Sequence, residues 1–215
     1  MTLTLFCPSR GRPKDAIALA ESFVKTTSQA QLYFLVDSDD PTKDDYPQSD
    51  TLIGEPTGDP TGPLNRAALA SESDIVGFIG DDSRLVTPGW DVLVEGALRT
   101  PGFAWGSDGH DAPWPSTVFI SSSIVRALGY MVPVTLRRGF FDSAWVELAE
   151  RTQTARVVQA NFPHDNSKGD PTSLNYDPAY RVNPAIIAAD EVAFRTWVAT
   201  QMPRDIQTVR HLVYS

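Results

Sequence analysis

The chain has 215 residues, of which 41% are hydrophobic and 21% are charged, and its formal net charge at pH 7 is −9. This length predicts one domain and allows a sizeable core that needs no disulfide or metal to fold. The single cysteine, Cys7, excludes an internal disulfide framework and a cysteine-cluster zinc site, and it is typical of a reducing compartment. The acidic balance argues against nonspecific DNA binding, which depends on many contacts between basic side chains and phosphates.

The sequence contains no apolar stretch of the length that a membrane span needs. Its first residues lead directly into an apolar run, without the basic segment that begins a signal peptide. We therefore expect a soluble cytoplasmic protein that has no membrane partner.

The first half of the chain alternates short apolar segments with segments of helical spacing. Strands are predicted at residues 3–7, 31–36, 51–53 and 75–79. Helices are predicted after Pro13, at 64–70 and at 90–98. The apolar face of the first helix is predicted to consist of Ile17, Ala20 and Phe23 or Val24. Short apolar strands between helices imply an α/β fold with a mostly parallel sheet that is covered on both faces.

The second half is less regular. Strands are predicted at 103–106, 117–120 and 155–159. Helices are predicted at 122–128 with Gly129 as its end, at 143–151 with Asp142 or Ser143 as its N-cap, and at 188–201 with Pro203 as its end. Two long polar loops remain, at 37–63 and 161–184, and loops of that length in a compact domain are usually functional or disordered.

Three predicted strand ends are polar, at residues 8–12, 37–40 and 80–82. Ligands of open parallel sheets bind at the carboxyl ends of the strands, so these segments are expected to converge on one cleft. Arginine binds phosphate oxygens, and aspartate oxygens bind Mg²⁺ or Mn²⁺. The combination predicts a site for a nucleoside diphosphate with a divalent cation.

Several common motifs are absent from the sequence. No G-x-G-x-x-G follows the first strand, which weakens a dinucleotide-binding interpretation, and no phosphate-binding G-x-x-x-x-G-K-[ST] motif is present. The G-x-S-x-G elbow of many hydrolases is also missing.

The segments Leu5-Phe-Cys-Pro-Ser-Arg-Gly-Arg-Pro13, Leu35-Val-Asp-Ser-Asp-Asp40 and Ser73-Asp-Ile-Val-Gly-Phe-Ile-Gly-Asp-Asp82, in this order, resemble a glycosyltransferase of the GT-A fold. Family 2-like enzymes, particularly the small soluble ones of bacteriophages, are the most similar. The resemblance is good over residues 3–98 and weak beyond them.

The resemblance implies a single catalytic domain over 1–215, with a Rossmann-like central sheet flanked by helices. Residues 1–100 would form its nucleotide-sugar-binding half, and 101–215 would form a less regular acceptor half with the C-terminal helices.

The resemblance also implies roles for individual residues. Contacts with the nucleotide sugar are expected from Pro8, Ser9, Arg10, Arg12, Asp37, Asp39, Asn65 and Asp81. The segment Gly80-Asp81-Asp82 is similar to the D-x-D metal motif, with Gly80 in place of its first aspartate. Asp82 would bind the metal, and His164 would be a further metal ligand. Asp142 is similar to the catalytic base.

Aromatic residues are interpreted by their position in the predicted elements. Trp105 and Trp114 lie in irregular segments and are candidates for stacking on a sugar or acceptor ring. Trp90, Trp145 and Trp197 fall on helix faces and are expected in the core.

The function implied is metal-dependent transfer of a sugar from a nucleotide sugar, preferably a UDP-sugar, to a hydroxyl of a DNA base or a virion protein. Inversion at the anomeric carbon is favoured over retention. Two alternatives stay open. A sugar-1-phosphate nucleotidyltransferase fits Lys14 but lacks its Gly-rich loop, and a non-catalytic nucleotide-sugar or carbohydrate-binding module fits Gly80 in the metal motif.

Overall fold

The computed structural model describes residues 1–109, 115–165, 173 and 183–215. These residues form one sheet from the strands β1 (Leu3–Pro8), β2 (Gln31–Asp37), β3 (Thr51–Gly54), β4 (Ile75–Phe78), β5 (Phe103–Ser107), β6 (Val118–Ser121) and β7 (Ala155–Asn161). The strand order is β3-β2-β1-β4-β6-β5-β7. Strand β6 is antiparallel to both of its neighbours, and the other pairs are parallel. The predicted mostly parallel α/β sheet is therefore confirmed.

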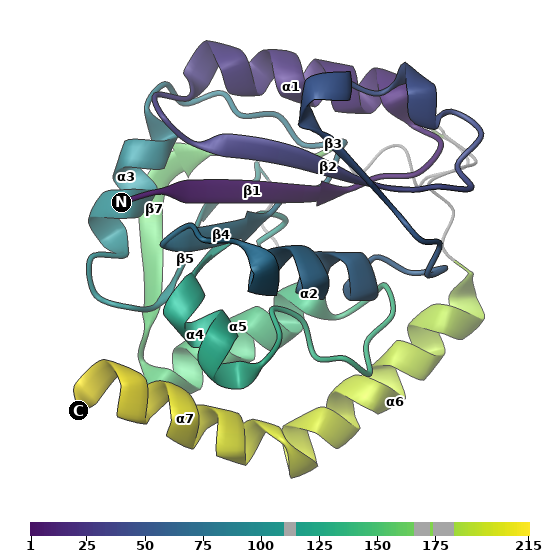
Figure 1. The fold of residues 1–215 in the computed structure, drawn as a ribbon. Helices are drawn as coiled ribbons and strands as arrows, with labels where there is room; N and C mark the ends of the chain where they lie inside the picture. The colour runs from purple at the N-terminus through teal and green to yellow at the C-terminus, as the bar shows by residue number, and fades with distance from the viewer. Residues whose placement is uncertain (110–114, 166–172, 174–182) are drawn as a thin grey trace.

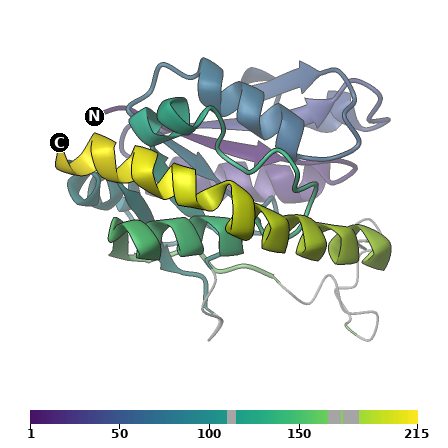
Figure 2. The ribbon, with the colours of Figure 1, turned by 90° about the horizontal axis from the view of Figure 1, so that it is seen from below.

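Helices cover both faces of this sheet, as expected. They are α1 (Pro13–Thr26), α2 (Thr61–Ala70), α3 (Trp90–Ala97), α4 (Ser122–Leu128), α5 (Phe141–Thr152), α6 (Pro184–Thr200) and α7 (Met202–Tyr214). Helices α1 and α3 pack on one face, and α2, α4 and α5 pack on the other. Figures 1 and 2 show α6 and α7 joined as an arch outside this second layer. No helix of the described residues is long and apolar enough to cross a membrane.

The core consists of two apolar clusters, one on each face of the sheet. In β1, Leu5 and Cys7 belong to the cluster under α1 and α3, whereas Phe6 belongs to the other. Successive strand side chains point to opposite faces, so a strand covered on both faces is apolar along its whole length. The mostly apolar composition of β1 follows from this position between two layers, and the hydroxyl of the buried Thr4 lies 2.8 Å from the Ser73 hydroxyl.

The buried face of α1 differs from the predicted one. Ala16, Leu19 and Phe23 are buried, whereas Ile17 and Val24 are 42% and 75% exposed. Phe23 is buried and Ala20 packs against the same cluster, so the prediction is correct for these two residues and wrong for Ile17. Pro13 does stand in the first turn, as predicted.

The helix predicted at 188–201 ends where expected, because α6 ends at Thr200, but a further helix, α7, follows it and is not predicted. Pro203 lies in the first turn of α7, where its missing N–H breaks no helical hydrogen bond. Pro203 therefore belongs to the start of α7, whereas the sequence predicts it as the end of the last helix. Helix α6 begins earlier than predicted, at Pro184, and the Asn183 side chain accepts a hydrogen bond from the Ala185 N–H.

Parallel pairing brings three strand ends to the same edge of the sheet. Pro8 at the end of β1 pairs with Leu35 of β2, and Phe6 of β1 pairs with Phe78 of β4. The segments that follow these strands therefore emerge side by side, on the right in Figure 1. This edge of the sheet carries the predicted site residues.

Candidate functional site

A cleft of about 900 Å³ opens at the carboxyl ends of β1, β2 and β4. It is lined by all three polar segments that were expected to converge, together with residues from the α4–α5 connection and from the segment after β7. The predicted site residues that line it are Pro8, Ser9, Arg10, Arg12, Asp37, Asp39, Asp81, Asp82, Asp142 and His164.

Asp81 holds the segment after β1 in place. Its carboxylate lies 2.8 Å from Arg12 Nη2 and accepts a hydrogen bond from the Ser9 hydroxyl. The Asp81 side chain is fully buried. Burial raises the pKa of Asp81 to about 6, against the opposing effects of Arg12 and Ser9. These contacts join the ends of β1 and β4, and through them the Asp81 carboxylate binds groups of the protein itself.

Two buried groups that the sequence analysis did not single out support the same segment. The Tyr46 hydroxyl accepts a hydrogen bond from the Arg12 N–H and lies 3.0 Å from the Ser9 hydroxyl. Asp40 accepts a hydrogen bond from the Gly11 N–H at 2.8 Å, and Gly11 has the left-handed φ of +70° that glycine tolerates best.

Burial alone would raise the pKa of Asp40. The hydrogen bonds from the N–H groups of Thr42 and Gly11 outweigh this effect, so the net shift of the pKa is downward and the carboxylate stays charged. The spacing of Asp40 and Thr42 is a sequence signal for this turn, because an Asp side chain commonly accepts from the N–H two residues on. No comparable signal marks Tyr46.

Arg10 lies at the rim of the cleft, between two carboxylates of the β2 end. Its Nη1 is 3.0 Å from Asp37 Oδ2 and 2.5 Å from Asp39 Oδ1. The hydrogen bond from Arg10 lowers the pKa of Asp39. Half of the Arg10 side chain is exposed, and ion pairs in such positions contribute little to stability. A phosphate can therefore compete for this guanidinium at small energetic cost.

Asp82 and His164 meet at the wall of the cleft, where His164 Nε2 lies 3.0 Å from Asp82 Oδ2. The chain after β7 runs antiparallel beside the chain after β4, and Ser83 pairs with His164 in an isolated bridge. Burial lowers the pKa of His164, but its hydrogen bond to Asp82 and the Asp82 charge raise it more, so the net shift is upward.

Gly80, in the first position of the metal motif, lies close to the Asp82 side chain. A Cβ atom at Gly80 would lie 2.7 Å from Asp82 Oδ1, closer than side chains tolerate. The Asp82 carboxylate therefore occupies space that an aspartate at position 80 would need.

The donor chemistry of this pair fits a divalent cation. A carboxylate oxygen and an imidazole nitrogen are both ligands of Mn²⁺, and Mg²⁺ usually takes one or two carboxylates together with substrate phosphates. No cluster of three or more His, Cys, Asp and Glu side chains suited to a metal occurs within 1–109, 115–165, 173 and 183–215. Asp82 and His164 would supply two ligands, and phosphate oxygens and water would complete the set.

The opposite wall of the cleft is formed by the segment before α5 and its first turn. Asp142 lines this wall, and burial raises its pKa above the ordinary carboxyl value. The N-cap of α5 is Phe140, so the predicted capping role of Asp142 or Ser143 is wrong. The hydrogen bonds that the structure gives Asp142 Oδ1 are local, from the N–H and the hydroxyl of Ser143.

Asn65 does not line the cleft. It is buried in α2, where its Nδ2 donates to the Val132 carbonyl and its Oδ1 accepts from the N–H groups of Met131 and Val132, each at 2.8 Å. Its amide is therefore satisfied by the loop after α4. These hydrogen bonds support a structural role for Asn65, and the expected contact with the nucleotide sugar stays a prediction.

The tryptophans divide between the core and the cleft. Trp105 packs against the apolar cluster on the α2, α4 and α5 face and is not among the residues that line the cleft. Trp114 lies outside the described residues. Trp90, Trp145 and Trp197 are buried, as predicted. Trp145 also lines the cleft, and its Nε1 donates to the Met131 carbonyl at 2.8 Å.

No family model matches the sequence, and no curated protein matches it. Solved structures are similar at 11–16% identity. Glucosyl-3-phosphoglycerate synthase from Mycobacterium tuberculosis, in complex with Mn²⁺, UDP and glucosyl-3-phosphoglycerate, aligns with a TM-score of 0.60 and 14% identity over 92% of this chain and 79% of its own.

Two further structures show the same similarity. TarS from S. aureus in complex with UDP-GlcNAc aligns with a TM-score of 0.58 and 12% identity over 100% of this chain and 74% of its own. The mannosyltransferase PcManGT from Pyrobaculum calidifontis in complex with GDP-Man and Mn²⁺ aligns with a TM-score of 0.52 and 11% identity over 96% of this chain and 72% of its own. In another alignment with TarS, this chain spans 62% of the length of the structure it matches.

Identities this low show a shared fold. The order of the strands, the helices on both faces of the sheet and these structural similarities together identify the fold of this chain as GT-A, a Rossmann-like α/β fold with a mostly parallel central sheet.

Proposed function

We propose that this protein is a metal-dependent glycosyltransferase that moves a sugar from a nucleoside diphosphate donor, preferably a UDP-sugar, to an acceptor hydroxyl. The observation that carries the proposal is the convergence of three polar strand ends on one cleft, with Asp82 and His164 3.0 Å apart at its wall. The structures with UDP, UDP-GlcNAc and GDP-Man support a nucleotide-sugar donor.

The donor half of the cleft offers both positive and negative groups to a nucleotide. Arg10 and Arg12 have the fork geometry that binds phosphate oxygens, and Asp37 and Asp39 would accept hydrogen bonds from a ribose or a base. Pro8 and Ser9 would contact the nucleotide from the segment after β1. Asp81 would act indirectly, because its carboxylate fixes Arg12 and Ser9.

A divalent cation held by Asp82 and His164 would stabilise the negative charge that develops on the departing diphosphate. Arg10 and Arg12 would bind and orient the same phosphates. The cleft also lowers the exposure of the reacting groups to water, which strengthens these electrostatic contacts.

On the acceptor side, Asp142 would take the proton from the attacking hydroxyl. Its raised pKa makes the ionised carboxylate a better base than an exposed aspartate. The hydroxyl oxygen would attack the anomeric carbon as the bond to the diphosphate breaks, with inversion of configuration. Retention in the product would contradict this role of Asp142.

Two classes of acceptor can be compared against the charge of the cleft, a modified DNA base and a hydroxyl on a protein. Among the described residues, seven aspartates and three arginines line the cleft. This excess of negative charge opposes the approach of duplex DNA, so we expect transfer to a protein or a small acceptor. Transfer of a labelled sugar to DNA that carries hydroxymethylated pyrimidines, in preference to a protein, would contradict this choice.

The experiment that tests the proposed activity is release of UDP from a panel of UDP-sugars in the presence of Mn²⁺, measured with and without acceptors. We expect at least one donor to release UDP and Asp142→Asn to slow the release. No release from any nucleotide sugar, combined with pyrophosphate formation from a nucleoside triphosphate and a sugar-1-phosphate, would identify a nucleotidyltransferase.

A further inference from the structure

Residues 138–142 line the wall of the cleft that carries Asp142, and we call the segment 136–142 the acceptor loop. Arg138, Phe140 and Asp142 are among its members that line the cleft. Phe140 has a φ of 64°, in the left-handed region that non-glycine residues rarely adopt. Such a conformation persists only where the surrounding structure holds it. The contacts that hold the acceptor loop therefore decide the shape of this wall.

The main support comes from one carboxylate on α6. Asp190 is 1% exposed, and its two oxygens accept hydrogen bonds from three consecutive backbone N–H groups of the acceptor loop. The distances are 3.0 Å from Arg137, 2.7 Å from Arg138 and 2.7 Å from Gly139. Hydrogen bonds to a charged acceptor are about twice as strong as neutral ones, so this is the best-anchored part of the loop.

Helix α6 also packs closely against the acceptor loop. The Phe194 ring stacks on the Phe140 ring, with centroids 5.4 Å apart and an interplanar angle of 21°. A Cβ atom on Gly139 would lie 3.0 Å from Ile187 Cδ1, so a glycine at this position allows α6 to approach. Figure 2 shows α6 as the half of the arch that reaches toward this end of the molecule.

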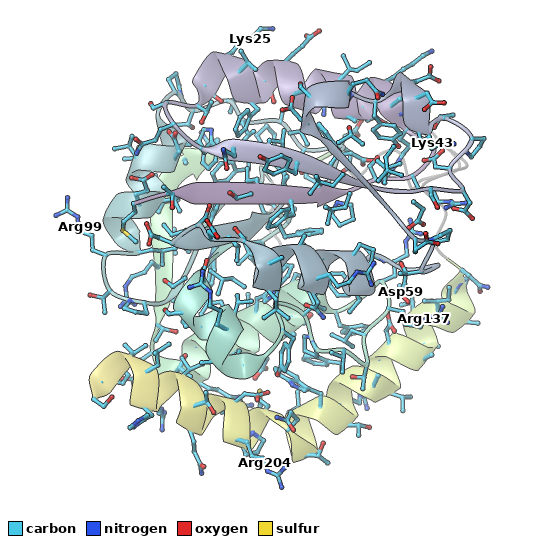
Figure 3. The ribbon with its side chains drawn as sticks, viewed as in Figure 1. Lys25, Lys43, Asp59, Arg99, Arg137 and Arg204 are labelled. Carbon is cyan, nitrogen blue, oxygen red and sulfur yellow. The ribbon has the colours of Figure 1, made fainter. Side chains whose placement is uncertain are left out.

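The other side of the acceptor loop is held from α2 and the turn before it. The Thr61 hydroxyl donates to the Leu136 carbonyl, and Arg137 lies 3.5 Å from Asp59. Figure 3 shows Asp59 and Arg137 side by side. Because Asp59 and Thr61 hold only the start of the loop, the three N–H groups bound by Asp190 set the path of the chain into Phe140.

We propose that Asp190 is a positioning residue that fixes the acceptor loop so that Asp142 and Arg138 face the bound acceptor. The proposal rests on the glycosyltransferase function proposed above. Asp142 follows Phe140 by two residues, so the direction of the first turn of α5 depends on the conformation that Asp190 maintains. A displacement of about 1 Å in a catalytic group can lower a rate by about a hundredfold.

The chain contains a matched control for this carboxylate. Asp91 on α3 is fully buried and likewise accepts hydrogen bonds from three consecutive backbone N–H groups, those of Ser28, Gln29 and Ala30, at 2.7, 2.7 and 3.2 Å. These hydrogen bonds lie before β2, at the end of the sheet opposite the cleft. Asp91→Asn removes the same kind of contact without touching the site.

The test compares Asp190→Asn, Asp91→Asn and the wild-type protein in steady-state transfer and in hydrogen exchange of the peptide that spans the acceptor loop. For Asp190→Asn we expect kcat to fall by about tenfold or more while the KM for the donor stays within about twofold, because the donor half of the cleft is unchanged. Exchange in the acceptor loop should be faster. Asp91→Asn should keep kcat and exchange faster only before β2.

The proposal is overturned if acceptor-loop exchange rises in Asp190→Asn while kcat is unchanged, or if Asp91→Asn loses as much kcat as Asp190→Asn. Should Asp190→Asn not fold, Phe194→Leu loosens the same loop more gently and should lower kcat with the donor KM unchanged. Failure of the proposed function would be seen in the wild-type protein, as absent transfer, whereas failure of the positioning role is seen only between variants.

Discussion

The aspartates of the cleft differ in what their oxygens contact, and these contacts separate supporting residues from candidate reacting groups. Asp40 and Asp81 are fully buried and hold the segment after β1 through Gly11, Arg12 and Ser9. Asp82 faces the His164 imidazole. The hydrogen bonds that the structure gives Asp142 come from its neighbour Ser143. Residue type alone does not separate these roles, because all four are aspartates at the end of a strand or the start of a helix.

The pH dependence of kcat should report Asp142. A base must be ionised, and burial raises the pKa of Asp142, so kcat should fall as the pH drops through a value above the ordinary carboxyl pKa of about 3.9. Asp142→Asn should lower kcat by about a hundredfold and remove this acidic limb. A pH–rate profile of the wild type and the variant checks this.

Stability should change in the opposite direction at the same residue. Because its pKa is higher in the folded state, protonated Asp142 favours folding; this contribution is complete below the unfolded-state pKa and is lost as the pH rises through the folded-state value. The neutral Asp142→Asn side chain should therefore give a Tm at pH 7 equal to or above that of the wild type. A lower Tm together with a lower kcat would indicate a structural role.

Gly80 should matter for the cation and not for the fold. In Gly80→Ala the new Cβ would lie 2.7 Å from Asp82 Oδ1, so the carboxylate must turn away. We expect the Mn²⁺-dependent affinity for UDP to fall by about tenfold, which calorimetry can measure. Gly96→Ala in α3 is the control, because a Cβ there meets nothing within 4 Å. Equal UDP affinity in both variants would contradict the assignment of Asp82.

At the scale of elements, much of the site geometry depends on connections between helices and loops that are far apart in sequence. The sequence predicts the strands and most helices well, because β1 and β4 are mostly apolar and Gly129 ends α4 as expected. The start of α5 and the separate helix α7 are missed, because Asp142 suggests an N-cap and Pro203 suggests a helix end, whereas Phe140 caps α5 and Pro203 stands in the first turn of α7. The hydrogen bonds of the Asn65 amide to the loop at 131–132 are an example of such a connection between a helix and a loop.

Asn65→Ala should destabilise the protein without changing nucleotide binding. The substitution leaves two buried N–H groups and a carbonyl of the loop at 131–132 without their partners. We expect the free energy of unfolding to fall by about 2–4 kcal/mol. Urea denaturation measures this, and Asn161→Ala on the exposed side of β7 is the control. A loss of UDP affinity in folded Asn65→Ala would restore the role implied by the resemblance.

At the scale of the whole molecule, the distribution of charge says more about the site than the net charge of −9 does. Lys25, Arg99 and Arg204 lie on the outer surface in Figure 3, away from Asp59 at the cleft. The sequence predicts that the polar strand ends converge, because parallel strands end at one edge. It does not predict which carboxylates are neutralised internally, since Arg12 with Asp81 and Arg10 with Asp37 pair across separate strand ends.

The proposed binding of an anionic diphosphate in an acidic cleft is expected to depend on a cation. The central claim is therefore tested most directly by calorimetric titration of UDP into the wild-type protein and Asp82→Ala, each with Mn²⁺ and with a chelator. We predict that the wild type binds UDP at least about a hundredfold more tightly with Mn²⁺ than with chelator, and that Asp82→Ala loses this difference. UDP binding that is equally tight without the cation, or unchanged in Asp82→Ala, would contradict it.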